Sequence, residues 1–366
     1  MNTASSNKSD GQVSILAITA PRALTYLQRE LSVPGPGEVR VQTIFSGISH
    51  GTEMNVYRGL APQWSRVYDR EVRLFRPATE AERARPARGY WTPGDPVWDF
   101  PLAYGYANVG RVATLGPGVT GIAEGDLVYS YMPHQTAYVA PATSLIRLPE
   151  LKNPAQGVLL SNITTAFNGV LDTRIGQDDT VVVFGQGLIG LLVTQLVRRS
   201  AAAQVITVDR LAVRRAMSEK LGADLVLDPA EVDVAMEVRK QTGNRGADVV
   251  IEVSGSYAAL QEAIRTAAPN TTITAMSWYG GSGEALRLSD EFHHNRVSIR
   301  SSQVGAVDPA QVTWSMGRRQ QSVIDAFSYL ELESLLTTYI PFKEAARGYD
   351  LVDNHSDQII QVVLQY

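Results

Sequence analysis

The stretch from Thr180 to Asp209 constrains the fold of this chain more than any other. Thr180–Phe184 is strand-forming and runs directly into the G-x-G-x-x-G motif of residues 185–190, after which a helical pattern begins. A second strand-like run ends in Asp209, about 20 residues after the motif. Strand, glycine motif, helix, strand and acid in this order are typical of a dinucleotide-binding βαβ unit.

Each part of this unit has a physical role toward a bound dinucleotide. Gly185 permits a tight turn, Gly187 lets the backbone approach a pyrophosphate, and Gly190 allows the helix and the strand to pack closely. The helix N-terminus offers free N–H groups to the phosphates, and Asp209 can accept hydrogen bonds from ribose hydroxyls. The residues expected to contact the dinucleotide here are Gly185, Gln186, Gly187, Leu188, Ile189, Gly190, Asp209 and Arg210.

The acid at the end of the second strand also bears on the choice of cofactor. The Asp209 carboxylate would repel the 2′-phosphate of NADP, which favours NAD. Arg210, Arg214 and Arg215 follow it, and an arginine beside the acid can accommodate that phosphate. NAD is therefore the predicted cofactor, and NADP is the alternative.

Length and charge narrow the class of protein further. The chain has 366 residues, which is long for one hydrophobic core and predicts two domains. Its net charge of −4 gives no electrostatic reason to expect a nucleic-acid or membrane partner. No apolar run approaches the roughly 20 residues of a membrane-spanning helix, and residues 1–11 lack an apolar signal core. We therefore expect a cytoplasmic protein that acts on a small molecule.

The secondary-structure pattern changes near residue 153. Short strand-like runs separated by turns rich in Pro and Gly precede this point, whereas helices and apolar strands alternate after it. Such alternation predicts a parallel, doubly wound sheet with helices on both faces. The predicted fold class is α/β, with a β-rich domain followed by a Rossmann domain.

The order of several further motifs resembles the medium-chain dehydrogenase/reductase superfamily. They lie at Pro34–Val39, Phe45–His50, Val109–Val112, Gly116–Val119, Gly125–Val128 and Leu221–Asp224. The resemblance implies a GroES-like catalytic domain over residues 1–153, a Rossmann domain over 154–300, and a return of 301–366 to the catalytic domain. It also implies a homodimer in which an edge strand near Glu284–Leu288 pairs between Rossmann domains.

The chain departs from the zinc-dependent members of that superfamily. It contains no cysteine, and the resemblance places Ser49, Gly105-Tyr106-Ala107 and Ser161 or Asn162 where zinc relatives carry their ligands. Catalytic zinc is held by Cys, His, Asp or Glu, so we predict a zinc-independent enzyme with no metal ligands. A rebuilt metal site from His50, Glu53 and His134 is the alternative.

Within the superfamily, the chain resembles a subgroup that lacks zinc ligands and includes bacteriochlorophyllide dehydrogenase. The similar segments are Ser46–Glu53 with Val56–Gly59, Tyr104–Val112, Phe292–Arg296 and Ser301–Gly305. The resemblance implies that Ser49 and Tyr106 face the nicotinamide, and that His50 contacts the pyrophosphate. It also implies that Thr165, Val253, Ser254 and Ser277 lie along the nicotinamide half of the cofactor.

Without zinc, acid–base chemistry at a carbonyl oxygen must come from side chains. We take Ser49, Glu53 and Tyr106 as the catalytic candidates, because a tyrosine hydroxyl can donate a hydrogen bond to a carbonyl and relay its proton. Each also has a structural alternative. Tyr106 could be a packed aromatic, Glu53 an acid in the first turn of a helix, and Ser49 a small residue that leaves room for substrate.

The segment from residue 61 to 100 is longer than its counterpart in most relatives. It holds Trp64, Trp91 and Trp98 together with seven arginines. Such a segment beside an active-site loop often forms a lid or a substrate pocket, and Trp and Arg suit a ring-bearing or anionic substrate. A solvated helix is the alternative. The predicted substrate contacts are Tyr57, Trp64, Trp91 and Trp278.

These observations predict an NAD(P)-dependent oxidoreductase that does not use zinc. It would transfer a hydride between nicotinamide and an alcohol/carbonyl pair of a polar or ring-bearing metabolite. A quinone or enone reductase, which needs no strong acid, is the first alternative. A non-catalytic NAD(P)H-binding protein is the second.

Overall fold

The computed structural model describes residues 11–83 and 99–366, which form two compact units. The first unit contains the described residues up to Val158 together with Tyr339–Asp350 and Val362–Tyr366. The second contains Leu159–Thr338 and Leu351–Gln361. Residues 301–338, which the sequence-based division assigns to the catalytic domain, stay in the second unit because α8 (Met316–Ala326) packs along α3 (Leu160–Asp172).

The first unit is built around the long strand β3 (Glu38–Ile48). It pairs antiparallel with β7 (Asn108–Leu115), β9 (Ala137–Pro141) and β18 (Val362–Gln365). The remaining strands are β1 (Gln12–Ala20), β2 (Ala23–Glu30), β6 (Leu102–Ala103), β8 (Leu127–Ser130), β10 (Ile146–Arg147) and β17 (Thr338–Pro341). Apolar side chains of these strands, including Val41, Val112 and Tyr138, form a buried core, because alternate residues face inward.

Helical turns connect these strands and carry the segments of chemical interest. The helix α1 (Thr52–Tyr57) follows β3 directly, and α9 (Ala345–Asn354) precedes β18. Single 3₁₀ turns lie at Pro62–Trp64, Ala142–Ser144 and Phe342–Glu344.

The described part of the long segment 61–100 is mainly a hairpin. Its strands are β4 (Arg66–Asp69) and β5 (Leu74–Pro77), and a single turn, α2 (Glu80–Arg83), follows. Trp91 and Trp98 lie outside the described residues. Over residues 66–77 this segment is therefore an antiparallel hairpin. The solvated helix considered as an alternative concerns the charged residues 80–88, of which the described part forms the turn α2 and the remainder lies outside the described residues.

The second unit contains a six-stranded sheet in the order β13-β12-β11-β14-β15-β16, and all of its strand pairs are parallel. The strands are β11 (Thr180–Phe184), β12 (Gln204–Val208), β13 (Leu225–Leu227), β14 (Val249–Glu252), β15 (Thr272–Ala275) and β16 (Ser298–Ser301). Every residue of β11 and β14 is buried. Continuous burial explains why these strands have apolar runs instead of alternation.

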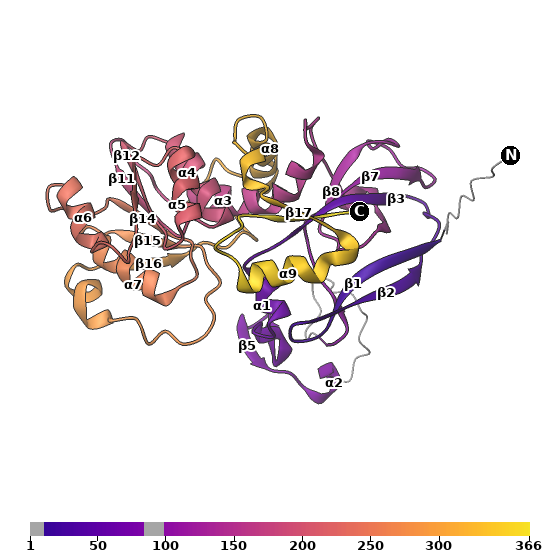
Figure 1. The fold of residues 1–366 in the computed structure, drawn as a ribbon, viewed down its shortest axis with the longest axis horizontal. Coiled ribbons are helices and arrows are strands. Elements are labelled where there is room, and N and C mark those ends of the chain that lie inside the picture. Colours follow the sequence, from indigo (N-terminus) through magenta and orange to yellow (C-terminus); the bar gives the residue numbers. More distant parts are fainter. Residues whose placement is uncertain (1–10, 84–98) are drawn as a thin grey trace. The chain divides into compact units, whose positions relative to one another are not determined.

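Helices cover both faces of this sheet (Figure 1). They are α4 (Leu188–Arg198), α5 (Ala212–Lys220), α6 (Val234–Gln241) and α7 (Tyr257–Thr266). The helices α4 and α5 contact β12, whereas α6 packs on α7, which contacts β14. Right-handed crossovers in opposite directions from β11 place the two pairs on opposite faces. Two 3₁₀ turns lie at Pro154–Leu159 and Glu333–Leu335, and the first leads directly into α3.

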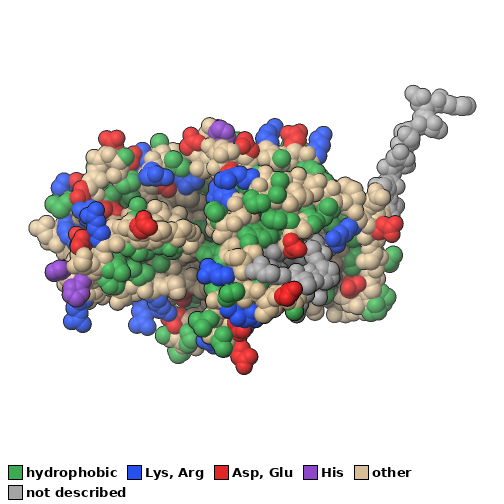
Figure 2. Space-filling model, turned by 90° about the horizontal axis from the view of Figure 1, so that it is seen from below, with side chains coloured by type: hydrophobic (Ala, Val, Ile, Leu, Met, Phe, Trp, Pro, Cys, Tyr) green, Lys and Arg blue, Asp and Glu red, His purple; other side chains and the backbone are tan. Residues whose placement is uncertain are grey.

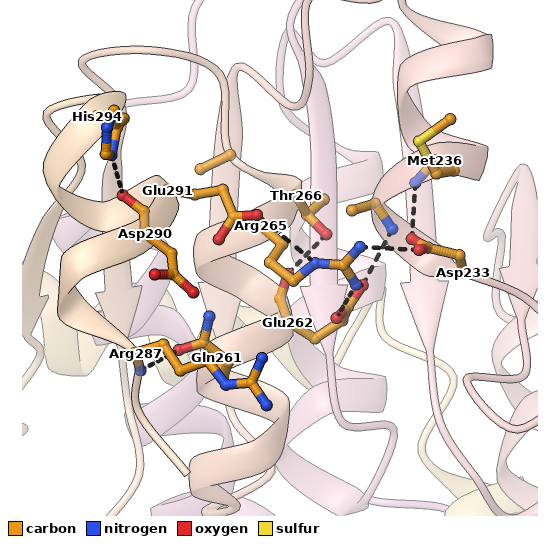
Figure 3. Close-up of polar contacts among 12 residues, drawn as sticks. Asp233, Met236, Gln261, Glu262, Arg265, Thr266, Arg287, Asp290, Glu291 and His294 are labelled. Atoms are coloured by element: carbon orange, nitrogen blue, oxygen red, sulfur yellow. Dashed lines mark hydrogen bonds and ion pairs between the residues drawn. The ribbon is translucent and has the colours of Figure 1, made fainter.

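The edge of this sheet differs from the expectation. Residues 284–288, all of them described, form no strand; they lead into a π-helical turn, Leu288–Phe292. The Arg287 backbone N–H donates to the Gln261 side chain on α7 at 2.7 Å, which holds the segment against that helix and away from a ladder (Figure 3). The edge strand is β16, so the predicted position of the edge strand was wrong.

The surface is mixed in charge. On the face drawn in Figure 2, acidic and basic side chains are interspersed with small apolar areas. Among the described residues, no helix is long and apolar enough to cross a membrane.

Candidate active site

The glycine motif of the second unit has the geometry that its sequence predicts. Gly185 has a φ of +91°, and a Cβ there would lie 2.7 Å from the Ser254 Cα. A Cβ on Gly190 would lie 1.9 Å from the Gly185 carbonyl oxygen. Neither position can hold a side chain. The backbone at Gly185 packs on Ser254, and the first turn of α4, which contains Gly190, packs on Gly185.

Gly187 differs from its two neighbours because it faces open space. The nearest atom to a Cβ built there is Nη1 of Arg214, at 3.7 Å. Gly187 is also the N-cap of α4, and no side chain caps this helix end. The open backbone and the uncapped N–H groups form a cradle that fits a pyrophosphate.

Asp209 is held rigidly at the end of β12. Its carboxylate accepts the backbone N–H of Gln186 at 2.7 Å and that of Leu211 at 2.8 Å, and its side chain is 8% exposed. Nη1 of Arg214 lies 4.0 Å away, and burial lowers the pKa of that guanidinium. The donor set fits an adenosine ribose, since carboxylate lone pairs remain for hydroxyl groups. Arg210 is exposed beside it.

Other predicted cofactor residues follow the neighbouring strands. The Val253 backbone N–H donates to the Phe184 carbonyl at 2.9 Å, and Ser254 then packs on Gly185. Ser277 follows β15. Because carboxyl ends of parallel strands meet at one edge of a sheet, these loops and the glycine motif share that edge.

Gln186 and Thr165 have more local roles than the motif suggests. The Gln186 side chain is fully buried, donates to the Gly185 carbonyl at 3.1 Å and accepts from Thr194. Gln186 therefore holds the glycine loop from within, and its backbone N–H is already paired with Asp209. Thr165 lies half-buried on α3, where its hydroxyl donates to the Ser161 carbonyl at 3.0 Å.

The first unit brings together Ser49 and Tyr106, two of the predicted catalytic residues. Ser49 directly follows β3 and is 9% exposed. The Tyr106 hydroxyl donates to the Ser49 hydroxyl. Burial raises the pKa of Tyr106 to about 12, opposed by its hydrogen bonds with Ser49 and Thr52. Near neutral pH the phenol is therefore protonated, and the Ser49 proton remains available to an oxygen acceptor.

Glu53, the third catalytic candidate, is fully buried on α1. One carboxylate oxygen accepts the Ser49 backbone N–H at 2.9 Å. The other lies 2.8 Å from Nε2 of His134 and also accepts the Tyr349 hydroxyl. Glu53 therefore fixes the backbone that carries Ser49.

The hydrogen-bonded network continues beyond His134. Its Nδ1 atom lies 2.7 Å from the Ser46 hydroxyl, which lies 2.8 Å from the Tyr366 hydroxyl. A Cβ on Gly105 would lie 2.8 Å from the His134 ring, so the imidazole fills the space beside that glycine. Burial raises the pKa of Tyr349 and of Tyr366, which keeps both as neutral donors.

The residues present in the first unit do not fit a catalytic zinc ion. Ser49 and Tyr106 offer hydroxyls that already bond to each other, and neither is a usual zinc ligand. Glu53 and His134, part of the alternative metal site, bond to each other. The described residues contain no group of three His, Cys, Asp or Glu side chains that could hold a metal.

Of the predicted substrate residues that the structure describes, Tyr57 and Trp64 lie in the first unit and Trp278 in the second. Tyr57 is buried against Tyr349, with ring centroids 4.8 Å apart, and its hydroxyl donates to the Arg22 carbonyl. Trp64 stacks on Phe100 at a centroid distance of 4.4 Å, and Trp278 is 40% exposed. His50, which is predicted to contact the pyrophosphate, lies half-buried directly after Ser49.

Sequence reasoning missed the partners that hold these groups. Tyr349 and Tyr366 lie about 300 residues from Glu53 and Ser46, so no local pattern could have revealed them. Glu252 was also overlooked, although a signal was present. It is a lone carboxylate in an apolar strand, and buried charges require specific partners.

Comparisons with known proteins identify relatives that are named dehydrogenases. The family model described as zinc-binding dehydrogenase matches residues 189–318. D-guloside 3-dehydrogenase of Shigella flexneri is 31% identical over 354 residues, covering 95% of this chain and 98% of that protein.

Solved structures share the fold across the whole chain. The 2R,3R-butanediol dehydrogenase from Bacillus subtilis has a TM-score of 0.76 at 19% identity, covering 97% of this chain and 99% of that one. The NADH complex of the short chain alcohol dehydrogenase rspB from Escherichia coli CFT073 has a TM-score of 0.74 at 20% identity, covering 97% and 100%. These likenesses confirm the predicted combination of a GroES-like domain and a Rossmann domain.

Proposed function

The chain belongs to the medium-chain dehydrogenase/reductase superfamily, and from this premise we propose that it is a zinc-independent, NAD(P)-dependent oxidoreductase. It transfers a hydride between nicotinamide and an alcohol/carbonyl pair of a polar or ring-bearing metabolite. The observation that carries this proposal is the hydrogen bond between the Tyr106 and Ser49 hydroxyls, at positions that the sequence resemblance assigns to zinc ligands.

The second unit holds the cofactor in this proposal. Asp209 binds the adenosine ribose, and the N–H groups after Gly187 bind the pyrophosphate. The loops that begin at Val253 and Ser277 bind the nicotinamide half. When bound, the nicotinamide exchanges a hydride with the substrate carbon. NAD is the expected form, because a 2′-phosphate would face the Asp209 carboxylate.

The hydroxyl pair supplies the proton. Tyr106 donates to the Ser49 oxygen, which orients the Ser49 proton toward the substrate oxygen. In carbonyl reduction, Ser49 gives its proton to that oxygen and regains one from Tyr106, which is reprotonated from solvent. The Ser49 hydroxyl, oriented by Tyr106 before the reaction, can stabilise the developing alkoxide.

Glu53 acts through Ser49 and not on the substrate. It is fully buried, and its contact with Ser49 is to the backbone N–H. We assign it a positioning role, with His134 and Tyr349 holding the carboxylate in place.

We infer the substrate class from the name of a relative and from the aromatic and charged side chains of the hairpin at residues 66–77. A relative named for a guloside supports a sugar-ring alcohol as the first class to test. The hairpin of residues 66–77 adds aromatic and charged groups, among them Tyr68 and Phe75 in contact and Arg66 over the Phe75 ring. Such groups suit stacking on ring-bearing, polar molecules.

Nucleotide titration with metal analysis of the same sample tests this function. We expect NADH to bind more tightly than NADPH, zinc to be substoichiometric, and turnover to occur with glycosides or sugar alcohols. Stoichiometric zinc would overturn the metal-free chemistry. Turnover restricted to enones or quinones would indicate the conjugated-bond reductase, and binding without any turnover would indicate a non-catalytic protein.

A further inference from the structure

A buried carboxylate beneath the proposed nicotinamide loops has no role in the chemistry above. We propose that Glu252 is a positioning residue that holds the loops after β14 and β15 together and thereby sets the affinity for the nicotinamide half of the cofactor. This inference rests on the proposed function, because it assumes that those loops bind the nicotinamide half.

The contacts of Glu252 join two loops that the sequence keeps apart. Glu252 is the last residue of β14 and is fully buried. Its Oε1 atom accepts the Ser254 backbone N–H at 2.7 Å and also the Ser254 hydroxyl. Its Oε2 atom accepts the hydroxyl of Tyr279, which follows β15. One carboxylate therefore ties the first loop to the second.

The same loops pack directly on the glycine motif. A Cβ on Gly185 would lie 2.8 Å from the Ser254 Cβ, and a Cβ on Gly190 would lie 3.3 Å from Cγ1 of Val253. A Cβ on Gly255 would lie 3.7 Å from the Ser277 Cβ. The glycine motif therefore packs on the loop after β14, which in turn packs on the loop after β15. Glu252 is bonded to both of these loops.

The chemistry of the partners makes this clamp sensitive to substitution. The hydrogen bonds to Glu252 come from neutral donors, among them the Ser254 N–H and the hydroxyls of Ser254 and Tyr279. A carboxylate accepts them all, whereas a glutamine presents N–H groups toward one set of donors and leaves them unpaired. Burial also raises the pKa of Glu252, in keeping with a carboxylate that has donors but no cation among these partners.

The clamp predicts a selective effect on the two halves of the cofactor. Asp209, which would bind the adenosine ribose, directly follows β12, and Gly187, which would bind the pyrophosphate, is the N-cap of α4. The side-chain bonds of Glu252 go instead to Ser254 and Tyr279. Loss of the clamp should loosen the loops at residues 253–255 and 277–279 but leave the adenosine half of the site in place. NADH should then lose affinity, and ADP-ribose, which lacks the nicotinamide, should not.

The test is a fluorescence and calorimetric titration of the full-length Glu252→Gln variant with NADH and with ADP-ribose. We expect the Kd for NADH to rise about tenfold and that for ADP-ribose to change less than about twofold. With substrate in hand, KM for the nucleotide should rise by a similar factor while kcat stays within about threefold. An equal loss for both ligands, or no change in either, would overturn the proposal.

Glu262→Gln is the matched control. Glu262 lies on α7, packed beside β14, and makes its ion pair with Arg265 at 2.7 Å (Figure 3). The substitution is chemically identical, lies in the same unit and removes an anchored carboxylate. We expect the ratio of the two Kd values to match that of the wild type. A shift of this ratio as large as that of Glu252→Gln would mean that the effect is general and would overturn the proposal.

Tyr279→Phe keeps the proposal testable if Glu252→Gln does not fold. It removes one donor, leaves the two Ser254 contacts, and should raise the Kd for NADH about threefold with no effect on ADP-ribose. An unchanged Kd for NADH in this variant would count against the clamp. The wild-type protein is titrated before any variant. If the folded wild-type protein binds neither NADH nor NADPH, the proposed function itself fails.

Discussion

Each unit contains a buried glutamate that is bonded to a serine and to a tyrosine, but the two clusters differ in how their hydrogen bonds are arranged. Glu53 accepts the backbone N–H of Ser49, and Glu252 accepts that of Ser254. Both carboxylates are fully buried, and each also accepts a tyrosine hydroxyl. The difference lies in what happens to the serine hydroxyl.

In the first unit the serine hydroxyl is kept free of the carboxylate. The Ser49 hydroxyl oxygen accepts a hydrogen bond from the Tyr106 hydroxyl, so the Ser49 O–H can still donate to another acceptor. In the second unit the Ser254 hydroxyl donates to Glu252 and is used up by that bond. Glu, Ser and Tyr thus form a proton donor in one place and a closed clamp in the other.

The partners of the two carboxylates differ as well. Glu53 lies against His134, a group that can carry a positive charge. Glu252 is bonded to neutral donors, and burial raises its pKa. The two carboxylates therefore differ in the partners that offset the cost of burying them.

The largest expected effect comes from breaking the first cluster. Glu53→Gln should lower the free energy of unfolding by about 3 kcal/mol, because it leaves His134, Tyr349 and the Ser49 N–H with a poorer partner in a dry site. Urea denaturation measures this change. A loss below about 1 kcal/mol, as expected for a surface acid, would contradict this role of Glu53. A double variant with His134→Gln would show whether the losses from the two substitutions are coupled.

The second effect concerns activity and separates the two tyrosines. Tyr106→Phe should lower kcat for carbonyl reduction about 100-fold, because the Ser49 hydroxyl loses the donor that orients it. The Kd for NADH should stay the same. The matched Tyr279→Phe variant should instead leave kcat within about threefold. Equal losses of kcat in both variants would remove the distinction between donor and clamp.

A third effect is the dependence of stability on pH. The pKa of Glu252 is raised above its ordinary value of 4.5 in the folded state. Between that value and the folded one, the folded protein binds more protons than the unfolded chain, so stability falls as pH rises. Glu252→Gln should flatten the curve of unfolding free energy above pH 4.5, measured from about pH 4 to about pH 8. An unchanged curve would contradict the role of burial.

The smallest expected effect is an absence of change. Burial raises the pKa of Tyr106 to about 12. The acid form that reduction requires is therefore present throughout the range from about pH 6 to about pH 9. We expect kcat for carbonyl reduction to be flat in this range. A fall with an apparent pKa near 7 would assign the proton to a different group, with His50 the first to test.

The nucleotide unit was largely predictable because its signals are local. The glycine motif, Asp209 and the apolar strands follow one another within about 30 residues, the length of one βαβ unit. Their roles depend on backbone geometry, such as the positive φ of Gly185, that only certain residues permit. The edge strand at residues 284–288 was wrong because a contact with α7, which no local pattern reports, holds that segment.

The sequence by itself determined the α/β class, the dinucleotide fingerprint and the absence of cysteine ligands. It also brought Ser49, Glu53 and Tyr106 forward as a group. It could not distinguish their roles, because these depend on His134, Tyr349 and Tyr366, which come from distant parts of the chain. Only the tertiary structure decided that Glu53 is buried, that the Ser49 hydroxyl accepts from Tyr106 and that Glu252 joins two loops. Hydrogen-bond donors and acceptors pair according to their positions in space, and sequence separation leaves those positions open.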